Sequence, residues 1–306
     1  MAINIEAPER DDQFQAWAEI MRDVEGLWMD VAELRHSLEN DQESLWRLGY
    51  LDGRPAGVAV GRPSSLPGSA YGAVRVRPNL RRQGLGSELF AEIVAYARDR
   101  GATEIWGRMR ADDADSLAFA TKRGFREVGR ERDVVLELAK APPAAVRPPE
   151  GIDIVSFADR PDLIPAVFEL DNEVTVDIPA HRPHEPIPYD RWAHENLEGP
   201  GAFPEACFIA LAGEEVVGYT SLRRYGADSA EAENRLTAVR RTWRRKGIAT
   251  ALKLAQIEAA RAAGLERIFT TNDETNVGMR GVNARLGFEP EPERVVVSGP
   301  VPTGEA

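Results

Sequence analysis

The chain has 306 residues, a net charge of −12 and one cysteine, and its length allows two domains of about 150 residues each. Its 43% hydrophobic and 29% charged content is typical of a folded globular protein and excludes the disordered and fibrous classes. The acidic balance argues against nucleic-acid and anionic-membrane partners, and no run is apolar enough for a signal peptide or a membrane span, so we expect a cytoplasmic protein.

Strands and helices alternate through the first half of the chain. Residues 3–5 alternate like a short strand, two amphipathic helical stretches follow, and a hairpin then turns at Asp52-Gly53. The expected ranges of the other elements are 12–21, 31–38 and 85–98 for helices and 70–76 and 104–109 for strands. A short helix leads to Gly124-Phe125. This order predicts an α/β domain with a mixed central sheet flanked by helices.

The second half repeats the order after a proline-rich stretch. Residues 139–150 hold four prolines and predict an extended linker, placed at 141–150 between domains at 1–140 and 151–306. The second hairpin is expected to turn at Ala212-Gly213. The ranges expected of the other elements are 152–155, 235–239 and 267–271 for strands and 163–172, 189–197 and 248–262 for helices.

One set of residues recurs 163 positions further along the chain, with no insertion or deletion. Its members are Arg81, Gly84, Gly101, Gly124 and Phe125, which return as Arg244, Gly247, Gly264, Gly287 and Phe288. A repeat of this length is a duplicated domain, too long for a solenoid unit. Two gap-free copies make the loop a much more specific signal than a single copy.

In both copies a strand leads into a glycine-bearing loop that opens a helix, with basic residues beside it. Such a loop presents free backbone N–H groups and the positive end of the helix dipole to an anion. Glycine, or alanine at the last position, lets a phosphate approach the backbone closely. We therefore predict a pyrophosphate cradle in each copy. The cradle residues are Val76, Arg81, Arg82, Gln83, Gly84, Leu85, Gly86 and Ser87 in the first copy and Val239, Arg244, Arg245, Lys246, Gly247, Ile248, Ala249 and Thr250 in the second.

Two other phosphate loops do not fit these residues. Neither copy has the Gly-Lys-Ser/Thr ending of an ATP-binding P-loop, and Leu89 and Leu252 replace the third glycine of the dinucleotide fingerprint. The pattern Arg-x-x-Gly-x-Gly/Ala, preceded by a valine-bearing strand and followed later by Gly-Phe, resembles the GCN5-related N-acetyltransferase (GNAT) superfamily. The resemblance covers both halves and is that of a tandem member.

The resemblance implies an acetyl-CoA-dependent N-acetyltransferase. It implies that a cradle holds the pyrophosphate of acetyl-CoA, that pantetheine lies between two splayed strands, and that an amine attacks the thioester directly. Such a transfer needs a base for the ammonium, a group that stabilises the leaving thiolate, and a backbone N–H for the oxyanion, expected near Val239 or Val76. It requires no metal.

The two copies differ at the expected base. Glu233 lies before the second cradle and, by strand alternation, shares a face with Thr237 and Val239. Its position resembles that of the general-base glutamate in histone acetyltransferases of the superfamily. At a constant offset of 163 the first copy has Ala70, which cannot act as a base. The sequence therefore favours the second half as the catalytic one. Glu231 is a competing candidate for the base, and the alternative for Glu233 is a solvated carboxylate at the end of a strand without a catalytic role.

The family also has an asparagine followed seven residues later by a tyrosine that protonates the thiolate. Asn276 matches the asparagine and is predicted to bind CoA, whereas Asn283 stands where the tyrosine is expected. The first copy has Asp113 and Ala120, which match neither. We predict that Asn283 hydrogen-bonds the sulfur or, alternatively, only the pantetheine arm.

The acceptor is predicted from charge alone. Residues 153–198 hold 11 acidic and 3 basic residues, in the region where the superfamily builds its acceptor wall. An amine acceptor that is cationic, whether a small molecule or a peptide, is one hypothesis, and a solvated helix face is the other. His181 and His184 lie in a proline-broken segment, so no metal site is predicted. Cys207, in a strand-like run, is expected to be a buried, inert thiol.

Three alternatives to second-half catalysis stay open. Catalysis in the first half is one, because its Gln-Gly-Leu-Gly loop is close to the family pattern. A mycothiol-synthase-like enzyme is another, because that tandem member has a similar length. A non-catalytic acyl-CoA sensor is the third, because tyrosine is absent from both acid positions.

Overall fold

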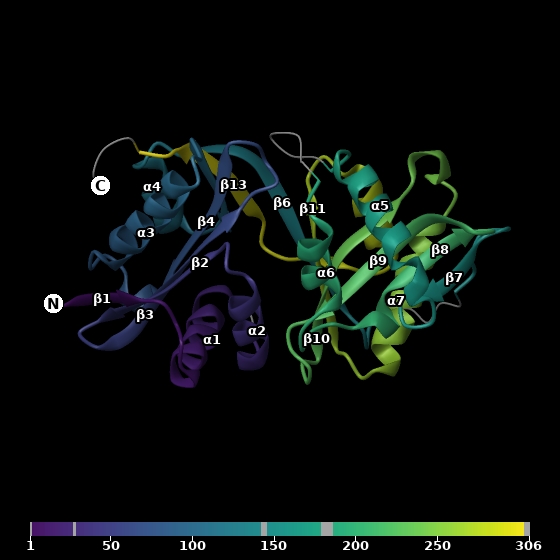
Figure 1. Ribbon diagram of the computed structural model, residues 1–306, viewed down its shortest axis with the longest axis horizontal. Coiled ribbons are helices and arrows are strands. Elements are labelled where there is room, and N and C mark those ends of the chain that lie inside the picture. The colour runs from purple at the N-terminus through teal and green to yellow at the C-terminus, as the bar shows by residue number, and fades with distance from the viewer. Residues whose placement is uncertain (1, 27–28, 142–145, 179–185, 303–306) are drawn as a thin grey trace. The chain divides into compact units, whose positions relative to one another are not determined.

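The computed structural model describes residues 2–26, 29–141, 146–178 and 186–302 (Figure 1). The chain forms two compact units, one of residues 1–130 with 294–306 and one of residues 131–293. Each unit repeats one order of strands and helices, which confirms the predicted α/β class with two copies of the domain. Within the described residues, no helix has the length and apolar character needed to cross a bilayer.

The first unit is a mixed sheet with helices on both faces (Figure 1). Its elements are β1 (Ile3–Glu6), α1 (Asp11–Glu25), α2 (Val31–Asn40), β2 (Leu45–Leu51), β3 (Arg54–Pro63), β4 (Ser69–Val76), the 3₁₀ turn η1 (Pro78–Leu80), α3 (Leu85–Asp99), β5 (Glu104–Arg110), α4 (Ala114–Thr121) and β13 (Arg294–Pro300). The strand order is β1-β2-β3-β4-β5-β13, and every pairing is antiparallel except β4 with β5.

The second unit has the same plan. Its elements are β6 (Arg126–Glu137, which enters this unit at residue 131), β7 (Asp153–Ser156), η2 (Pro161–Leu163), α5 (Ile164–Thr175), α6 (Tyr189–Leu197), η3 (Pro204–Ala206), β8 (Phe208–Ala212), β9 (Glu215–Arg224), β10 (Glu231–Val239), η4 (Arg241–Trp243), α7 (Ile248–Ala262), β11 (Arg267–Asp273), α8 (Val277–Arg285) and β12 (Glu289–Pro290). The strand order is β7-β8-β9-β10-β11-β6, with β10 and β11 parallel.

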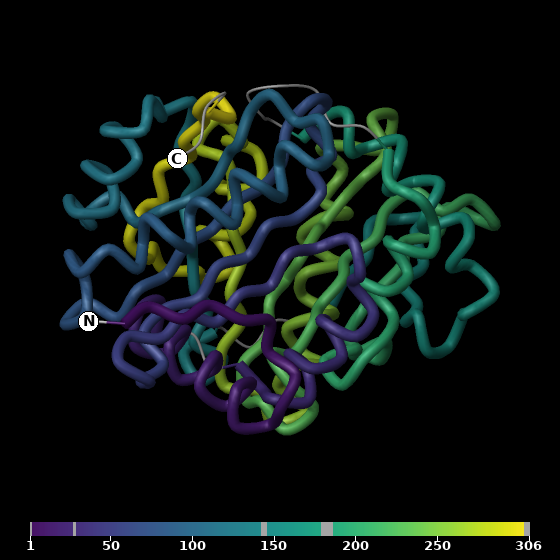
Figure 2. The backbone as a smooth tube through the Cα atoms, turned by 60° about the vertical axis from the view of Figure 1, so that its left-hand side comes forward, coloured from purple at the N-terminus to yellow at the C-terminus, as the bar shows by residue number. Residues whose placement is uncertain are grey.

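Each unit takes its last strand from the other half of the sequence. β13 follows the second copy of the repeat but pairs with β5 of the first unit, from Arg294 opposite Arg110 to Pro300 opposite Glu104. The yellow C-terminal strand accordingly lies beside the blue strands (Figure 2). β6 follows the first copy but pairs with β11 of the second unit. The compact units therefore differ from the linear division at 140 and 151 that the sequence predicts, and residues 146–150 of the predicted linker have no helix or strand.

Helical periodicity positions the two faces of the first unit. α3 buries Leu85, Leu89 and Ile93 at four-residue spacing against β4 and β5, so one stripe of this helix covers one sheet face. α1 buries Phe14 and Trp17 on the opposite face, together with Trp46 of β2. The same division holds in the second unit, where α7 covers one face and α5 and α6 cover the other. A ligand between β4 and β5 would thus lie between two different helical layers.

Two sequence predictions shift in detail. The second hairpin turns at Gly213 and Glu214, because β8 continues to Ala212. β10 begins at Glu231 rather than at Arg235 and contains a bulge between Asn234 and Leu236.

Candidate active site

The two loops predicted as phosphate cradles have the same backbone conformation. Arg82 has φ 64° and Gly84 has φ 88°, and their counterparts Arg245 and Gly247 have φ 63° and 87°. A non-glycine residue in this left-handed region costs roughly 1–2 kcal/mol, so the loops hold a strained conformation twice. A loop that alternates left-handed and right-handed conformations turns its backbone N–H groups toward one concave point, where an anion can bind. The arrangement is suited to a pyrophosphate in both units.

Space at the loops is compatible with a phosphate. A Cβ added to Gly86 would meet Phe119 at 3.6 Å and Val76 at 3.8 Å, which are ordinary contact distances. The protein itself therefore does not require glycine there, and Ala249 stands at this position in the second copy.

The cradle arginines are held by the protein. The Arg81 guanidinium donates to both oxygens of Asp113 at 3.0 and 3.1 Å, and its Nε lies 3.3 Å from the Val76 carbonyl oxygen. Arg244 donates to the Val239 carbonyl at 2.9 Å and to Asp177 at 2.6 Å. Both side chains thus fasten the loop to the end of the preceding strand.

Asp177 is also bonded to Arg241, and hydrogen bonds from Arg241 and then Arg244 hold the pKa of its carboxyl well below its usual range. The second cradle therefore carries a carboxylate that remains ionised at any physiological pH. Lys246 lies 4.2 Å from the ring centroid of Trp243, which packs against the core as an anchor.

The parallel strands separate immediately in front of each cradle. β4 and β5 pair only from Ser69 opposite Glu104 to Tyr71 opposite Trp106. β10 and β11 likewise pair only from Glu231 opposite Arg267 to Glu233 opposite Phe269. Beyond these points the strands splay, which creates the slot that the sequence resemblance implies for pantetheine.

In the first unit this slot opens into a cavity of about 530 Å³. The cavity runs from the cradle between the splayed strands, where the aromatic side chains of Phe90, Phe119 and Phe125 line it. At its other end it is lined by Glu25 of α1 and by arginines of β4 and β5. The cavity thus connects the anion-binding loop with the opposite face of the sheet, as a two-substrate site requires.

The pairing register corrects the predicted counterpart of Glu233. Glu233 lies opposite Phe269, whose repeat partner is Trp106, and Trp106 lies opposite Tyr71. The bulge at Arg235 inserts one residue into β10 that β4 lacks, so the offset of 163 does not hold before it. The first-unit counterpart of Glu233 is therefore Tyr71, not Ala70.

The same bulge changes the face on which Glu233 lies. Thr237 and Asn234 bond to each other and face α7, whereas Leu236 packs in the cluster formed by α5 and α6. Glu233, next to Asn234, therefore lies on the α5 and α6 face, and the prediction that it shares a face with Thr237 and Val239 is wrong. Its side chain is partly buried.

Tyr71 is an ionisable group at the start of the splay in the first unit. Its ring lies 4.9 Å from that of Trp106. Burial raises the pKa of its phenol, but the positive charges of Arg108, Arg75 and Arg62 outweigh burial and lower the pKa below its ordinary value. A phenol of lowered pKa exchanges protons more readily near neutral pH.

The corresponding slot of the second unit contains a buried amine. Lys253 is 1% exposed and stands at the repeat position of Phe90. Its Nζ lies 2.6 Å from Asn234 Oδ1 and 4.9 Å from the ring centroid of Phe288. Burial lowers the pKa of Lys253 to about 7. A polar network thus occupies the place where the first unit has an aromatic cavity wall.

The two asparagines predicted from the family pattern have distinct positions. Asn276 accepts a hydrogen bond from the Met279 N–H at 3.2 Å and is the N-cap of α8, just as Asp113 caps α4. Asn283 is 2% exposed, and its Nδ2 donates to Asn272 at 2.6 Å. Its Oδ1 is buried without a hydrogen-bond partner among the described residues, so it is an acceptor available to a donor in the slot.

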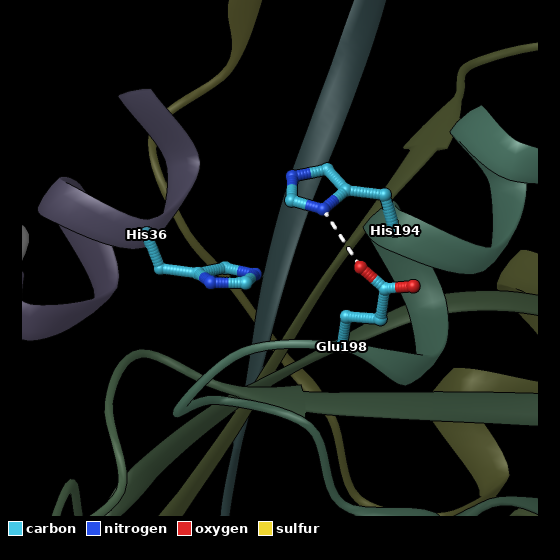
Figure 3. A group of neighbouring side chains, drawn as sticks. All are labelled: His36, His194 and Glu198. Atoms are coloured by element: carbon cyan, nitrogen blue, oxygen red, sulfur yellow. Dashed lines mark hydrogen bonds and ion pairs between the residues drawn. The ribbon is translucent and has the colours of Figure 1, made fainter. Parts of the chain in front are cut away.

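The histidines and the cysteine contribute differently. His181 and His184 lie outside the described residues. His194 Nδ1 lies 3.3 Å from a carboxylate oxygen of Glu198, one helical turn further on (Figure 3). His36, also drawn there, belongs to the other unit and lies 3.1 Å from the Asn40 amide. Cys207 is buried, and burial raises the pKa of its thiol to about 12, which agrees with the predicted inert role.

The model of the acetyltransferase (GNAT) family matches residues 9–125 and 164–288, one match in each copy of the repeat. The chain belongs to this family. Both matches include a cradle and the splayed strands in front of it, and the GNAT membership makes the protein an N-acetyltransferase.

Two curated relatives are acetyltransferases. The chain is 28% identical to an aminoglycoside N(6')-acetyltransferase type 1 of Stenotrophomonas maltophilia over 38% of this chain and 81% of that one. It is 29% identical to a mycothiol acetyltransferase of Catenulispora acidiphila over 48% of this chain and 44% of that one, less than half of that relative's length.

Solved structures share the tandem GNAT fold. A GCN5-related N-acetyltransferase of Sphaerobacter thermophilus has a TM-score of 0.75 at 21% identity, over 99% of this chain and 96% of that one. A tandem GNAT protein from the clavulanic acid biosynthesis pathway has a TM-score of 0.73 at 21% identity, over 99% of this chain and 100% of that one. At these identities the likeness concerns the fold.

Sequence reasoning missed the residues that distinguish the two slots. Tyr71 was hidden by the bulge, which no residue pattern announces. Lys253 was visible as a charged residue on the apolar stripe of α7, and its alignment with Phe90 could have revealed the difference. Glu25 and Arg75 carry no local signal, because only the fold brings them together.

Proposed function

We propose that the protein transfers an acetyl group from acetyl-CoA to an amine and that the first unit performs the transfer. The observation that carries the proposal is the cavity of about 530 Å³, which joins the first cradle to charged groups on the opposite face. It supports a site with room for the pantetheine arm between β4 and β5. This reverses the preference for the second half, which depended on pairing Glu233 with Ala70.

The residues of the first unit fit acetyl-CoA. The N–H groups of residues 82–87 would hold the pyrophosphate, and Phe90 and Phe119 would line the apolar arm. When bound, acetyl-CoA supplies the activated acyl group. The backbone N–H near Val76, at the end of the strand before the cradle, would bind the oxyanion.

Tyr71 is proposed to exchange the proton of the transfer. It lies where β4 and β5 begin to separate, and the surrounding arginines stabilise its phenolate. The Tyr71 phenolate would accept one proton of the ammonium, and the resulting phenol would donate that proton to the departing thiolate. The second proton that the nitrogen loses as the amide forms would pass to solvent. General acid–base catalysis of this kind contributes about 10²–10⁴-fold in rate.

A second candidate places the transfer in the second unit, with Glu233 as base and Asn283 hydrogen-bonding the sulfur or the pantetheine arm. The unpartnered, buried Oδ1 of Asn283 favours it, because an amide N–H or a thiol in the slot would satisfy that atom. Asn276 would then help to hold CoA through the start of α8. Lys253, which occupies part of the same slot, argues against it.

Matched loop variants decide between the units. Gly84→Glu and Gly247→Glu place the same charge at positions of nearly identical φ, so the backbone strain is equal in the two variants. With thiol release from acetyl-CoA as the readout and an amine panel as acceptors, we expect Gly84→Glu to lower turnover at least about 100-fold and Gly247→Glu to leave it within about twofold. The reverse pattern would assign the transfer to the second unit.

A further inference from the structure

An arginine that follows α4 lines the first-unit cavity beside the cradle. A guanidinium N–H of Arg123 donates to Ser87 Oγ, in the first turn of α3, at 2.8 Å, and another donates to the Phe119 carbonyl oxygen at 3.2 Å. The guanidinium carbon lies 3.5 Å from the centroid of the Phe119 ring, over which it stacks. These contacts hold Arg123 at the start of the helix that the cradle opens.

The charge of this guanidinium has no carboxylate partner among the described residues. At the same end of the cavity, Arg81 donates to both oxygens of Asp113, and the exposed Arg82 lies 3.5 Å from Asp115. Arg123 is half-buried, and burial lowers the pKa of its guanidinium without an opposing effect of an acidic neighbour. An arginine nevertheless stays charged at physiological pH. Arg123 therefore presents an unpaired positive charge to the cavity.

The guanidinium also has N–H groups available for a ligand. Arginine carries five N–H donors, and the bonds to Ser87 and Phe119 use only part of them. A half-buried cation is stabilised by an anion, and a guanidinium matches a phosphate with two parallel hydrogen bonds. Since Ser87 belongs to the first turn of α3, an anion that binds the N–H groups of this turn lies within reach of Arg123.

The second unit has a leucine at the position of Arg123. Leu286 is 5% exposed and belongs to the same core cluster as Phe288. The turn is the same in both units, because the backbone N–H groups of Arg123 and Leu286 each donate to the carbonyl oxygen three residues earlier. Phe119, on which Arg123 stacks, corresponds to Val282. The shared fold therefore does not require arginine here.

The second cradle has an additional cation at a different place. Lys246 lies in the loop itself, where the first copy has the uncharged Gln83. Arg123 reaches the first cradle from the end of α4 instead. Each cradle thus has one positive charge at a position where the other has none. A contact that served only the packing of α4 would not be replaced by a charge in the loop, so the exchange favours a role toward the anion that both loops suit.

We infer that Arg123 binds the pyrophosphate of acetyl-CoA in the first cradle and makes donor binding by this unit depend on the phosphates. This rests on the proposed function, because it adds a contact to the same acetyl-CoA site. Arg123 is a binding residue and takes no part in the proton transfer. The glycine-loop motif does not contain it, since Arg123 lies 36 residues after Ser87 and only the fold brings the two together.

Calorimetric titration of the full-length protein tests the inference without catalysis. The Gly247→Glu background disables the second cradle. The ligands are CoA, dephospho-CoA, which lacks only the 3′-phosphate, and pantetheine, which has no pyrophosphate. Arg123→Leu introduces the residue of the second unit and should weaken the binding of CoA and of dephospho-CoA at least about tenfold, because a charge-assisted bond to phosphate is lost. Pantetheine binding should not change, and Arg123→Lys should keep part of the CoA affinity.

A matched control removes the same charge nearby. Arg126→Leu, at an exposed position at the start of β6 and outside the cavity lining, should leave all three affinities unchanged. Equal weakening of all three ligands in Arg123→Leu would show that the side chain only packs against Phe119, and unchanged CoA affinity would show that it does not contact the ligand. Either result would overturn the inference. A loss for CoA but not for dephospho-CoA would place the guanidinium at the 3′-phosphate and would overturn the assignment to the pyrophosphate.

Thiol release from acetyl-CoA separates this inference from the proposed function. Weaker CoA binding in Arg123→Leu, with a raised KM for acetyl-CoA and a kcat within about twofold, supports both proposals. The same loss of CoA binding in a protein that releases no thiol with any amine would support the inference and contradict first-unit transfer. Turnover that Gly84→Glu abolishes, but that keeps its KM for acetyl-CoA in Arg123→Leu, would support first-unit transfer and contradict the inference.

Discussion

The two units have the same anion-binding loop and different slots in front of it. Arg82 and Arg245 share a left-handed φ to within one degree, and the strands in front of both loops separate after three paired residues. In this slot the first unit has Phe90 on a cavity wall, whereas the second has Lys253 in a buried hydrogen-bond network. The loop is therefore common to the two units, whereas the slots differ in their side chains and polarity.

The largest expected effect concerns the proton transfer. Tyr71→Phe removes the phenol and should lower kcat about 100-fold with little change in acetyl-CoA binding, because general acid–base groups contribute about 10²–10⁴-fold. Substitution of its register counterpart, Glu233→Gln, should leave kcat within about twofold of the wild-type value. Steady-state kinetics with the best amine of the panel measure both. A large loss in Glu233→Gln alone would reverse the roles of the units.

The pH profile sharpens the same comparison. The arginines lower the pKa of Tyr71 below its ordinary value, so the phenolate forms at lower pH than in a free tyrosine. Activity should therefore rise with pH through this lowered pKa. In Arg108→Met, which removes the largest of the positive charges that lower the pKa of Tyr71, the rise should shift to higher pH. An unchanged pH profile in this variant would show that Tyr71 does not transfer the proton.

Exchange of one slot residue tests the aromatic wall. Phe90→Lys places in the first unit the residue that the second unit has, and it should weaken acetyl-CoA binding to the first unit at least about tenfold, because a buried amine there has no counterpart of Asn234. Calorimetry of CoA binding measures the change, with circular dichroism as the folding control. Unchanged affinity would mean that the cavity wall does not contact the arm.

Lys253 gives a pH-dependent stability that belongs to the second unit. Its pKa is about 7 in the folded chain and about 10.4 when unfolded, so the unfolded chain binds more protons between these values. Stability should therefore rise by a few kcal/mol as pH rises from 7 to 10. Lys253→Met should flatten this dependence, and thermal unfolding at pH 7 and pH 10 checks it. An equal slope in the variant would show that Lys253 is not responsible.

The smallest effect concerns the second cradle. Asp177→Asn removes the carboxylate that holds Arg241 and Arg244, which frees their positive charge for a phosphate. We expect CoA affinity at the second cradle to rise about two- to fivefold. Titration of the variant in the Gly84→Glu background isolates this site. A fall in affinity would show that Asp177 instead shapes the loop.

The sequence predicted the order of elements and the position of both glycine loops, because glycine spacing and helical periodicity are local signals. It could not predict that β6 and β13 pair in the opposite unit, because the residues of a strand do not identify its partner strand. The sequence also assigned Glu233 the wrong counterpart in the first unit, Ala70 instead of Tyr71. A single inserted residue at Arg235 changes the register and the face of a strand, and it leaves no composition signal.

Hydrogen–deuterium exchange of the full-length protein with and without acetyl-CoA tests the central claim most directly, because peptides from the two units are followed in one sample. The account predicts protection of peptides that cover residues 81–90 and 107–113, around the cavity, with smaller changes at 244–253. Protection confined to residues 244–253 and 270–283 would contradict it and would assign the acetyl-CoA site to the second unit.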